Sequence, residues 1–389
     1  MKKTLLCFIL FALTVGEISS QPRLWNVQKL NKANTEHPAL VEQIIKNADK
    51  LLPKMISSIV DKDKPAPSGD MHDYISCAPY YWPDPTNPTG PYIRKDGEKN
   101  REVVTPDTKN LGIMTNSIVY LSLAYHLTSE EKYAAKAVEN LRIWFLNPKT
   151  KMNPNLNFGQ TISGRLNGKG RGAGLIDTYR FVEMLDGVEL LRKSPKFTKT
   201  DQENLSKWFG DFLNWMTTSE VGNQEYNAKN NHGVSFDIQA TRYALFAGKN
   251  DIALKFINDF PSRRLFAQIE PDGKQPAELA RTKALHYSAF NIAHMLDMYL
   301  IAKTLNIDLL NKASEDERSI LKAIEYMAQF ADKPQSQFPY SQINEWDADQ
   351  KLLIFQLYRI DTIRHKNNFV IYYKNKMTDY EKNYNLLLN

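Results

Sequence analysis

Apolar residues recur every three or four positions through most of this chain, as they do on the buried face of a helix. Two of these segments also open with residues that favour a helix N-terminus, one at Thr128-Ser129 and one at Thr200. Strand-like alternation of apolar and polar residues is scarce. The pattern predicts helices at roughly 38–60, 111–128, 130–147, 174–193, 200–218, 231–247, 250–260, 283–305, 315–332 and 348–361.

These helices follow one another in consecutive pairs joined by short turns. Such an order is typical of a toroid of helical hairpins or of a solenoid. No fixed sequence period recurs, which disfavours a standard repeat array. We therefore expect an all-α fold, a toroid or barrel of helical hairpins, that forms one domain over residues 21–389.

Two long segments interrupt the helical pattern, at residues 64–110 and 147–174. Loops of this length in a compact domain are usually functional or disordered. The first is rich in proline, glycine and aromatic residues, and Tyr80, Tyr81 and Trp82 argue against disorder. These rings either fill the core beneath a covering loop or form a cleft wall on which sugar rings stack.

Residues 1–20 have the features of a cleaved secretory signal peptide, namely Lys2 and Lys3, a short apolar run, and small residues before Gln21. The apolar run is too short to span a bilayer, and no later segment approaches the required length. We therefore expect a periplasmic or secreted protein without membrane insertion. Removal of residues 1–20 leaves Cys77 as a single cysteine, so no intrachain disulfide is expected.

Composition and charge narrow the classes of partner. The apolar content of 42% is ample for a core, and the formal net charge of +6 is modest for 389 residues. No lysine/arginine block or basic helix stands out, so nucleic-acid binding is not expected, whereas an anionic substrate suits the positive excess. The seven histidines form no His-x-x-x-His pair, so we expect neither a metal nor a cofactor. Nothing indicates an oligomer, and we expect a monomer.

Three clusters of polar residues are candidates for chemistry. The first lies just before an apolar helix, the second is an arginine followed shortly by His-Tyr, and the third lies in the loop 147–174. Their members are Asn230, Asn231 and His232; Arg281, His286 and Tyr287; and Asn157, Gln160 and Arg165.

The first two clusters also have purely structural interpretations. Asn231 would serve well as a helix N-cap, and His232 as a solvated residue of the first turn. Arg281 could pair with Glu278 at a spacing of three residues. Tyr287 could be a buried aromatic on an apolar helix.

Taken together, the clusters fit β-elimination at a uronic acid. Asparagine and arginine hold and neutralise a carboxylate, while histidine and tyrosine transfer protons. In this reaction the C5 hydrogen, which is α to the carboxylate, is removed and negative charge moves onto the carboxyl oxygens. Donors placed at those oxygens stabilise the charge where it develops, and an acid protonates the departing C4 oxygen.

The motifs "NNHG", "ELARTKALHY" and "MNPNLNFGQTISGR" on an all-helical, exported chain resemble the alginate lyase superfamily of polysaccharide lyases, over about residues 70–350. The resemblance implies an (α/α) toroid, complete or incomplete, with long loops over the cleft, and cleavage of alginate. It also implies that Asn231 and Arg281 neutralise the substrate carboxylate while His232 and Tyr287 transfer protons. By the same resemblance, the loop with Asn155, Asn157, Gln160 and Arg165 would face the cleft. The residues then expected to bind substrate are Asn230, Asn157, Gln160, Arg165, Tyr80, Tyr81, Trp82, Lys283 and His286.

One spacing departs from the pattern of the alginate lyases, in which arginine and tyrosine stand seven residues apart. Arg281 and Tyr287 are six apart, which on an unbroken helix would place them about 120° from each other. The preceding stretch "EPDGKQPAELAR" is rich in proline and glycine. We therefore expect Arg281 on a loop, with the helix beginning near Lys283.

The stereochemistry of the sugar divides the proton-transfer roles. In β-mannuronate and β-glucuronate the C5 hydrogen and the C4 oxygen lie on the same side of the ring, so Tyr287 could serve as both base and acid. In guluronate they lie on opposite faces, so His232 could be the base and Tyr287 the acid. Arg281 and Lys283, where they approach the phenol, would lower its pKa from the ordinary value near 10.

Other functions remain open on sequence grounds. Glucuronan or another glucuronate polymer is an alternative substrate for a lyase. An inverting glycoside hydrolase would need two carboxylic acids, for which Asp70, Asp73 and Asp177 are candidates. A non-catalytic glycan-binding protein would use the aromatic residues 80–82 alone.

Overall fold

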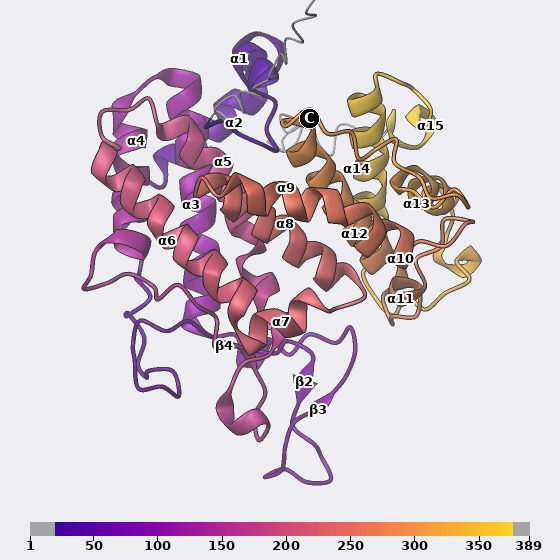
Figure 1. The fold of residues 1–389 in the computed structure, drawn as a ribbon, viewed down its shortest axis with the longest axis horizontal. Coiled ribbons are helices and arrows are strands. Elements are labelled where there is room, and N and C mark those ends of the chain that lie inside the picture. Colours follow the sequence, from indigo (N-terminus) through magenta and orange to yellow (C-terminus); the bar gives the residue numbers. More distant parts are fainter. Residues whose placement is uncertain (1–19, 376–389) are drawn as a thin grey trace, which may run out of the picture.

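A computed structural model describes residues 20–375 of the chain. Within these residues five long helices, each packed against the next, form the inner layer of an (α/α) toroid (Figure 1). All but one residue of the third inner helix is buried, because this helix is covered on every side. The inner helices are α3 (Pro106–Thr128), α5 (Arg180–Leu191), α8 (Asn231–Phe246), α12 (Ala284–Lys303) and α14 (Trp346–Arg364).

Further helices cover this layer from outside. One packs on α3, two pack on α8, one packs between α12 and α14, and two N-terminal helices lie on or beside α3. They are, in that order, α4 (Glu131–Leu141), α6 (Lys199–Thr218), α9 (Asn250–Phe260), α13 (Ile320–Ala328), α1 (Val27–Glu36) and α2 (Pro38–Asp49). Short helices complete the chain: α7 (Glu220–Tyr226), α10 (Phe266–Gln268), α11 (Pro276–Leu279) and α15 (Val370–Tyr373).

The helices predicted from the apolar pattern are confirmed, with corrections at their ends. The segment 38–60 is helical only to Asp49, and Pro53 lies in the turns that follow, where it cannot continue a helix. Helix α3 begins at Pro106, five residues earlier than expected, because the Thr105 hydroxyl caps it by accepting from the Thr108 N–H. The helix α1 and the short helices α7, α10, α11 and α15 were not predicted.

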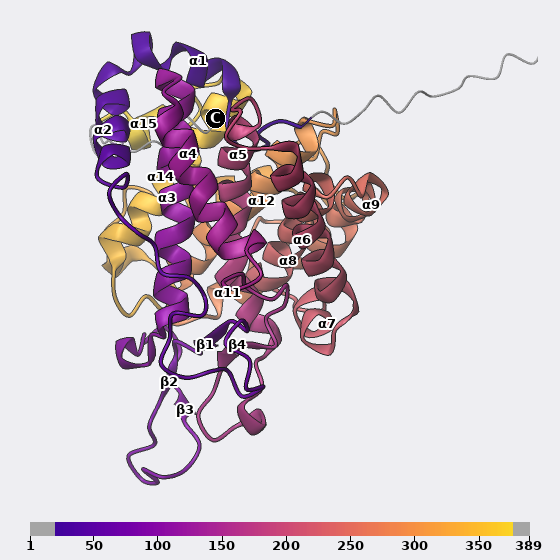
Figure 2. The same ribbon diagram turned by 90° about the vertical axis from the view of Figure 1, so that its left-hand side faces the viewer.

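The two long loops supply the few strands among the described residues. Strand β1 (Ile75–Cys77) pairs in parallel with β4 (Phe158–Thr161), which joins the first loop to the second. Strand β2 (Tyr81–Trp82) pairs antiparallel with β3 (Ile93–Arg94). These strands lie together at one end of the toroid, and α1 and α2 lie at the other (Figures 1 and 2).

The inner helices α5, α8 and α12 all begin at the end where the loops lie, since the first turns of all three border one cleft there. Further along these helices, Asp186 of α5 bonds Arg242 of α8 at 3.0 Å in the buried interior. The Asp186 carboxylate also accepts the backbone N–H groups of residues 23–25, which ties the N-terminal segment to the ring. None of the helices described is long and apolar enough to cross a membrane. The predicted signal peptide lies almost entirely outside the described residues.

Candidate active site

A cleft of about 640 Å³ lies between the loops and the first turns of α5, α8 and α12. Its walls combine aromatic rings, cationic side chains and the motif residues singled out in the sequence. Five lining side chains are arginine or lysine and one is a carboxylate. The lining includes Tyr80, Tyr81, Arg94, Lys99, Gln160, Arg171, Arg180, Glu225, Asn230, Asn231, His232, Arg281, His286 and Tyr287.

The motif "NNHG" begins helix α8. Asn230, not Asn231, is the N-cap, and its side-chain oxygen accepts the backbone N–H of His232. A Cβ on Gly233 would lie 2.2 Å from the carbonyl oxygen of Ala228 and 2.4 Å from the guanidinium of Arg264. Glycine at this position therefore lets the first turn of α8 pack directly against the preceding loop, which fixes where Asn231 and His232 point.

His232 is held by an acidic partner that the sequence did not reveal. Its Nδ1 lies 2.6 Å from Oε1 of Glu225, whose side chain is 4% exposed. A carboxylate can only accept, so Nδ1 carries a proton, and in the neutral tautomer with this bond Nε2 is the nitrogen without one. The imidazole is thus oriented as a general base, with a carboxylate placed to stabilise it once it is protonated.

Asn231 is buried and bound to Glu278 through two hydrogen bonds. Its backbone N–H and its Nδ2 donate to the two carboxylate oxygens at 2.6 and 2.7 Å. Burial raises the pKa of Glu278, while the two bonds from Asn231 oppose the rise. Glu278 therefore fixes the orientation of the Asn231 amide, and the alternative interpretation of an ion pair between Glu278 and Arg281 is not supported.

Arg281 lies on the loop between α11 and α12, as the sequence predicted. Its Nε and Nη2 bind the two oxygens of Asp96 at 2.9 and 2.7 Å, in the paired geometry that suits a carboxylate. Burial favours the neutral acid, but the bonds and charge of Arg281 outweigh it and hold the pKa of Asp96 below its usual range. The guanidinium carbon lies 3.6 Å from the centre of the Tyr287 ring. The Arg281 cation thus lies over the face of the phenol ring.

Tyr287 is 6% exposed and donates its hydroxyl proton to the hydroxyl of Tyr80 at 2.7 Å. Burial and the Tyr80 partner raise the pKa of Tyr287 well above 10, although the charge of Arg281 acts in the opposite direction. The expected lowering of this pKa is therefore wrong in sign. Lys283, the second cation on which that expectation relied, points elsewhere and bonds Glu345 and Asp349.

The other predicted residues divide between the cleft and its surroundings. His286 borders the cleft and its Nδ1 lies 2.7 Å from Asp349. Asn157 accepts from the Trp215 indole N–H, Arg165 donates to the Tyr92 carbonyl, and Trp82 donates to the Glu98 carbonyl. Asn155 donates to Asp73. Tyr80, Tyr81, Gln160 and Asn230 line the cleft, whereas Asn155, Asn157, Arg165, Trp82 and Lys283 do not.

Several residues that line the cleft or bond its lining side chains were not recognised from the sequence. Glu225 and Asp96 are single carboxylates in a chain with many, and only folding places them beside His232 and Arg281. Arg171 lies in "GKGRGAG", where the concentration of glycine and cations within a long loop was an available indication. The remaining missed residues are Arg94, Lys99 and Arg180.

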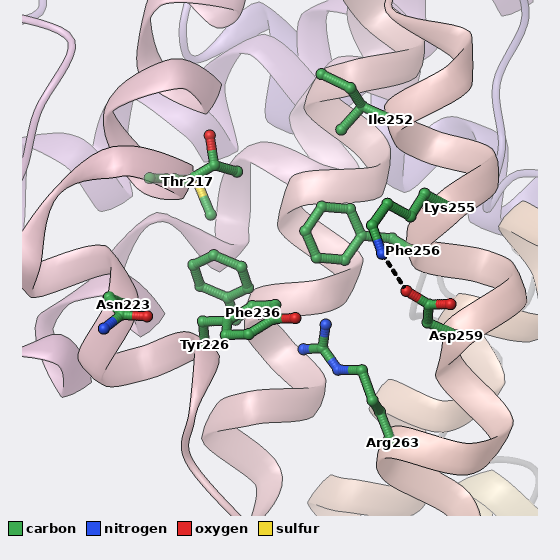
Figure 3. A pocket seen from close by; sticks show the side chains of 10 residues that line it. Thr217, Asn223, Tyr226, Phe236, Ile252, Lys255, Phe256, Asp259 and Arg263 are labelled. Atoms are coloured by element: carbon green, nitrogen blue, oxygen red, sulfur yellow. Dashed lines mark hydrogen bonds and ion pairs between the residues drawn. The ribbon is translucent and has the colours of Figure 1, made fainter.

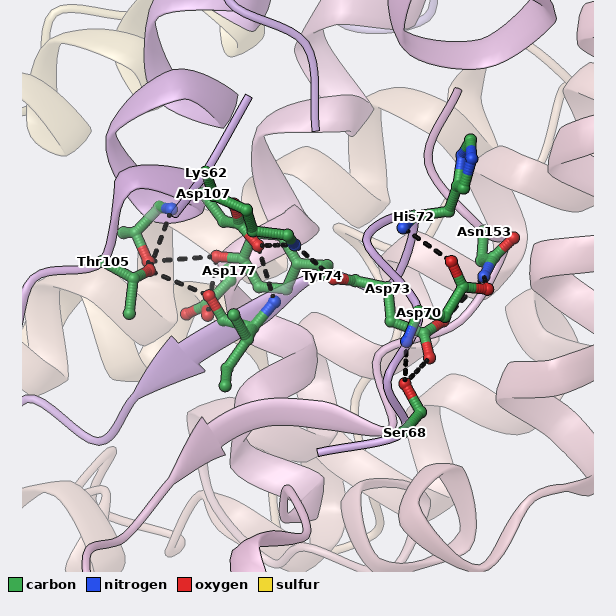
Figure 4. Close-up of polar contacts among 12 residues, drawn as sticks. Lys62, Ser68, Asp70, His72, Asp73, Tyr74, Thr105, Asp107, Asn153 and Asp177 are labelled. Atoms are coloured by element: carbon green, nitrogen blue, oxygen red, sulfur yellow. Dashed lines mark hydrogen bonds and ion pairs between the residues drawn. The ribbon is translucent and has the colours of Figure 1, made fainter. Parts of the chain in front are cut away.

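The carboxylates considered for a hydrolase act as structural acceptors (Figure 4). Asp70 and Asp73 share the side-chain amide of Asn153 at 2.9 and 2.8 Å. Asp177 accepts from the hydroxyls of Tyr74 and Ser76. None of the three lines the cleft. The residues described also contain no cluster of three or more histidine, cysteine or carboxylate side chains arranged to hold a metal ion.

A second pocket of about 360 Å³ lies on another face of α8 (Figure 3). It is mainly apolar, with Tyr226, Phe236 and Phe256 in its wall, and the guanidinium of Arg263 lies 3.8 Å from the Tyr226 ring centre. None of the predicted site residues lines this pocket. The chemistry implied by the motifs therefore belongs to the larger cleft.

Comparison with known proteins identifies the family. The family model described as alginate lyase matches residues 58–337. A crystal structure of an alginate lyase from Bacteroides ovatus is 45% identical in sequence, with 95% of both chains covered and a TM-score of 0.86. Alginate lyase A1-III from Sphingomonas species A1 is 14% identical over 89% of this chain and 90% of that chain, with a TM-score of 0.56, and shares the fold. No curated protein sequence matches the chain.

Proposed function

The chain belongs to the alginate lyase family of polysaccharide lyases, and from this premise we propose that it cleaves alginate by β-elimination in the cleft described above. The observation that carries the proposal is the combination of carboxylate-binding groups with two proton-transfer groups, His232 and Tyr287, in one cleft. Cleavage would leave a 4,5-unsaturated uronate at the new chain end.

Asn231 and Arg281 are proposed to neutralise the carboxylate of the reacting sugar. Arg281 keeps Nη1 available while Asp96 holds its other edge. The first turn of α8 adds the positive end of a helix dipole beside Asn231. These groups stabilise the charge that develops on the carboxyl oxygens when C5 loses its proton, which is usually the largest catalytic contribution.

His232 is proposed as the base for guluronate, with Glu225 holding Nδ1 so that Nε2 takes the C5 proton. Tyr287 is then the acid that protonates the C4 oxygen, and its raised pKa keeps the phenol protonated for this role. For mannuronate, Tyr287 would act as both base and acid. The phenolate needed there is favoured by Arg281 over the ring and opposed by burial. In the resting site the Tyr80 hydroxyl accepts a hydrogen bond from Tyr287, so it can assist transfer of the Tyr287 proton.

Further cleft residues are proposed to bind the polysaccharide. Tyr80 and Tyr81 offer ring faces for sugar stacking, and Asn230, Gln160 and His286 offer hydrogen bonds. Five lining cations favour a polyanion over a neutral glycan. The contacts of Asn157, Arg165, Trp82 and Lys283 with protein groups support a role in shaping the loops around the cleft.

The test uses purified protein with alginate, poly-mannuronate, poly-guluronate and glucuronan. Ultraviolet absorbance of the C4–C5 double bond reports elimination, and reducing ends report any cleavage. We expect both to rise on alginate, with Tyr287→Phe reducing turnover by about 10²- to 10⁴-fold on every polymer and His232→Ala reducing it most on poly-guluronate. Reducing ends without the chromophore would instead identify a hydrolase. Full turnover by Tyr287→Phe would refute the proposed acid.

We also propose that residues 1–20 direct export and are removed, and that the mature protein is a monomer. The apolar run behind Lys2 and Lys3 supports the first proposal. N-terminal sequencing of the exported protein should begin at Gln21, and light scattering should give the mass of one chain. An uncleaved N-terminus or a dimer mass would contradict the respective proposal.

A further inference from the structure

Arg171 differs from Arg281, the other partly buried arginine of the cleft, because no carboxylate of the described residues bonds its guanidinium. Arg281 and Arg94 both bond Asp96, at 2.7 and 2.6 Å. Arg171 is half-buried, and among the described residues its guanidinium has one hydrogen-bond partner, the neutral Oε1 of Gln160 at 2.8 Å. Its buried Nε has none there. Burial lowers the pKa of this guanidinium, so the fold bears a desolvation cost that an anion in the cleft would offset.

The neighbouring groups hold Arg171 in a defined position. Gln160 lies between Arg171 and Asp177, with Nε2 donating to Asp177 Oδ1 at 3.3 Å and Oε1 accepting from Arg171. Because the carboxylate of Asp177 can only accept, the amide oxygen of Gln160 must face Arg171. The guanidinium carbon also lies 5.4 Å from the centre of the Tyr81 ring.

Glycines bring the loop that carries Arg171 onto the strand that carries Gln160. A Cβ on Gly170 would lie 2.6 Å, and one on Gly174 2.5 Å, from backbone atoms of Gly159. The backbone N–H of Arg171 donates to the Gly159 carbonyl at 3.0 Å. Gln160 itself adopts a left-handed backbone with φ of +51°, held by its N–H bond to the Ser76 hydroxyl. Arg171 and Gln160 are therefore held in fixed positions in the cleft wall by the backbone around them.

Arg171 and Arg281 serve different parts of the cleft. Arg171 bonds Gln160 of β4 and lies 5.4 Å from the centre of the Tyr81 ring. Arg281 bonds Asp96 instead and lies 3.6 Å from the centre of the Tyr287 ring, beside the proposed acid. Every sugar of a uronate polymer carries its own carboxylate. A second guanidinium beyond the reacting carboxylate is thus placed for the sugar next to it.

We propose that Arg171, positioned by Gln160 and Asp177, binds the carboxylate of a uronate adjacent to the one that undergoes elimination. This inference rests on the proposed function of the cleft. It adds a binding site for a second negative charge and predicts that the protein prefers contiguous uronates over chains in which the neighbouring sugar is neutral.

The test is binding of a saturated oligo-uronate, measured by calorimetry in the Tyr287→Phe background so that turnover does not intervene. Adding Arg171→Gln should weaken binding by about 10- to 100-fold, the range for a charged hydrogen-bonded pair. Arg171→Lys should recover part of the loss because it keeps the charge without the planar fork. Lys169→Gln is the matched control, since it removes an exposed charge from the same loop without touching the cleft, and it should change binding less than 2-fold.

Kinetics of Arg171→Gln with Tyr287 intact complete the test. The inference predicts that KM for the polymer rises while kcat at saturation stays within about 3-fold of the parent, because uniform binding is lost. Unchanged binding and KM would overturn it, and so would a loss confined to kcat, which would place Arg171 at the reacting sugar. Failure of the proposed function would show itself separately, as absence of the unsaturated product with the unaltered protein.

Discussion

The hydrogen bond between Glu225 and His232 gives the sharpest test of the proton-transfer assignment. In Glu225→Gln the side chain keeps its size, and its amide oxygen can still accept from Nδ1. What is lost is the negative charge beside an imidazole that becomes positive when it removes the C5 proton. The variant therefore isolates the electrostatic part of the interaction.

The distance sets the magnitude. Nδ1 and Oε1 are 2.6 Å apart, and the Glu225 side chain is 4% exposed while that of His232 is 21% exposed. Two unit charges about 4 Å apart interact by about 4 kcal/mol at the effective dielectric constant of about 20 that describes such sites. The partly open imidazole reduces this value. We expect kcat on poly-guluronate to fall by about 10- to 10²-fold, which corresponds to about 1.4 to 2.8 kcal/mol at about 1.4 kcal/mol per tenfold.

The assay is the appearance of the unsaturated product from poly-guluronate and from poly-mannuronate, with each single variant and with Glu225→Gln combined with His232→Ala. If Glu225 acts through His232, the double variant should be no slower than His232→Ala alone. The loss should also be smaller on poly-mannuronate, where Tyr287 is the proposed base. Additive losses, or equal losses on both polymers, would refute the assignment of His232 as the guluronate base.

Three further predictions concern the scaffold of the site. Burial lowers the pKa of His294 to about 3, so on acidification the unfolded chain takes up a proton on this histidine before the folded chain does. The free energy of unfolding should therefore decrease as the pH drops from 6.5 toward 3, by about 3 kcal/mol at pH 4.5. Urea unfolding of His294→Phe should show a weaker dependence on acid pH. Asp186→Asn should lower the free energy of unfolding by about 3–5 kcal/mol, because Arg242 is left buried without its counter-charge. As the control, Asp211→Asn removes an exposed ion pair with Lys207 and should lower the free energy of unfolding by less than about 1 kcal/mol. Gly233→Ala should displace the first turn of α8, since the added methyl meets a carbonyl and a guanidinium, and should reduce kcat more than binding; wild-type kcat in that variant would contradict the role given to this glycine.

The fold was largely predictable because the evidence for it is local. Helical periodicity located the long inner and outer helices, and the absence of a repeat period favoured the toroid over a standard array. The residues at which the helices begin and end were harder to predict. Pro53 ended α2 and Thr105 began α3 through local chemistry that the apolar pattern does not report. The two-residue strands β2 and β3 exist only because residues 81–82 and 93–94 meet across a loop.

The motif residues of the site were predictable for a related reason. Asn230, Asn231 and His232 are consecutive and begin one helix, so their proximity follows from the sequence itself. Arg281 and Tyr287 are close along the chain, and the proline- and glycine-rich stretch before them indicated the loop on which Arg281 lies. The side chains of Asn157 and Arg165 were also expected at the cleft, but each is turned to a protein partner instead.

By itself, then, the sequence determined an all-helical toroid and the chemical character of two clusters, because helix periodicity and short motifs depend on neighbours a few residues apart. The tertiary structure decided which partners tune those clusters. Asp96 meets Arg281 across 185 positions, and Tyr80 meets Tyr287 across 207. Such contacts arise when packed inner helices bring distant loops to one end of the ring, and burial at that end sets the sign of the Tyr287 pKa shift. No local pattern carries that information, since the desolvation of a side chain depends on everything packed around it.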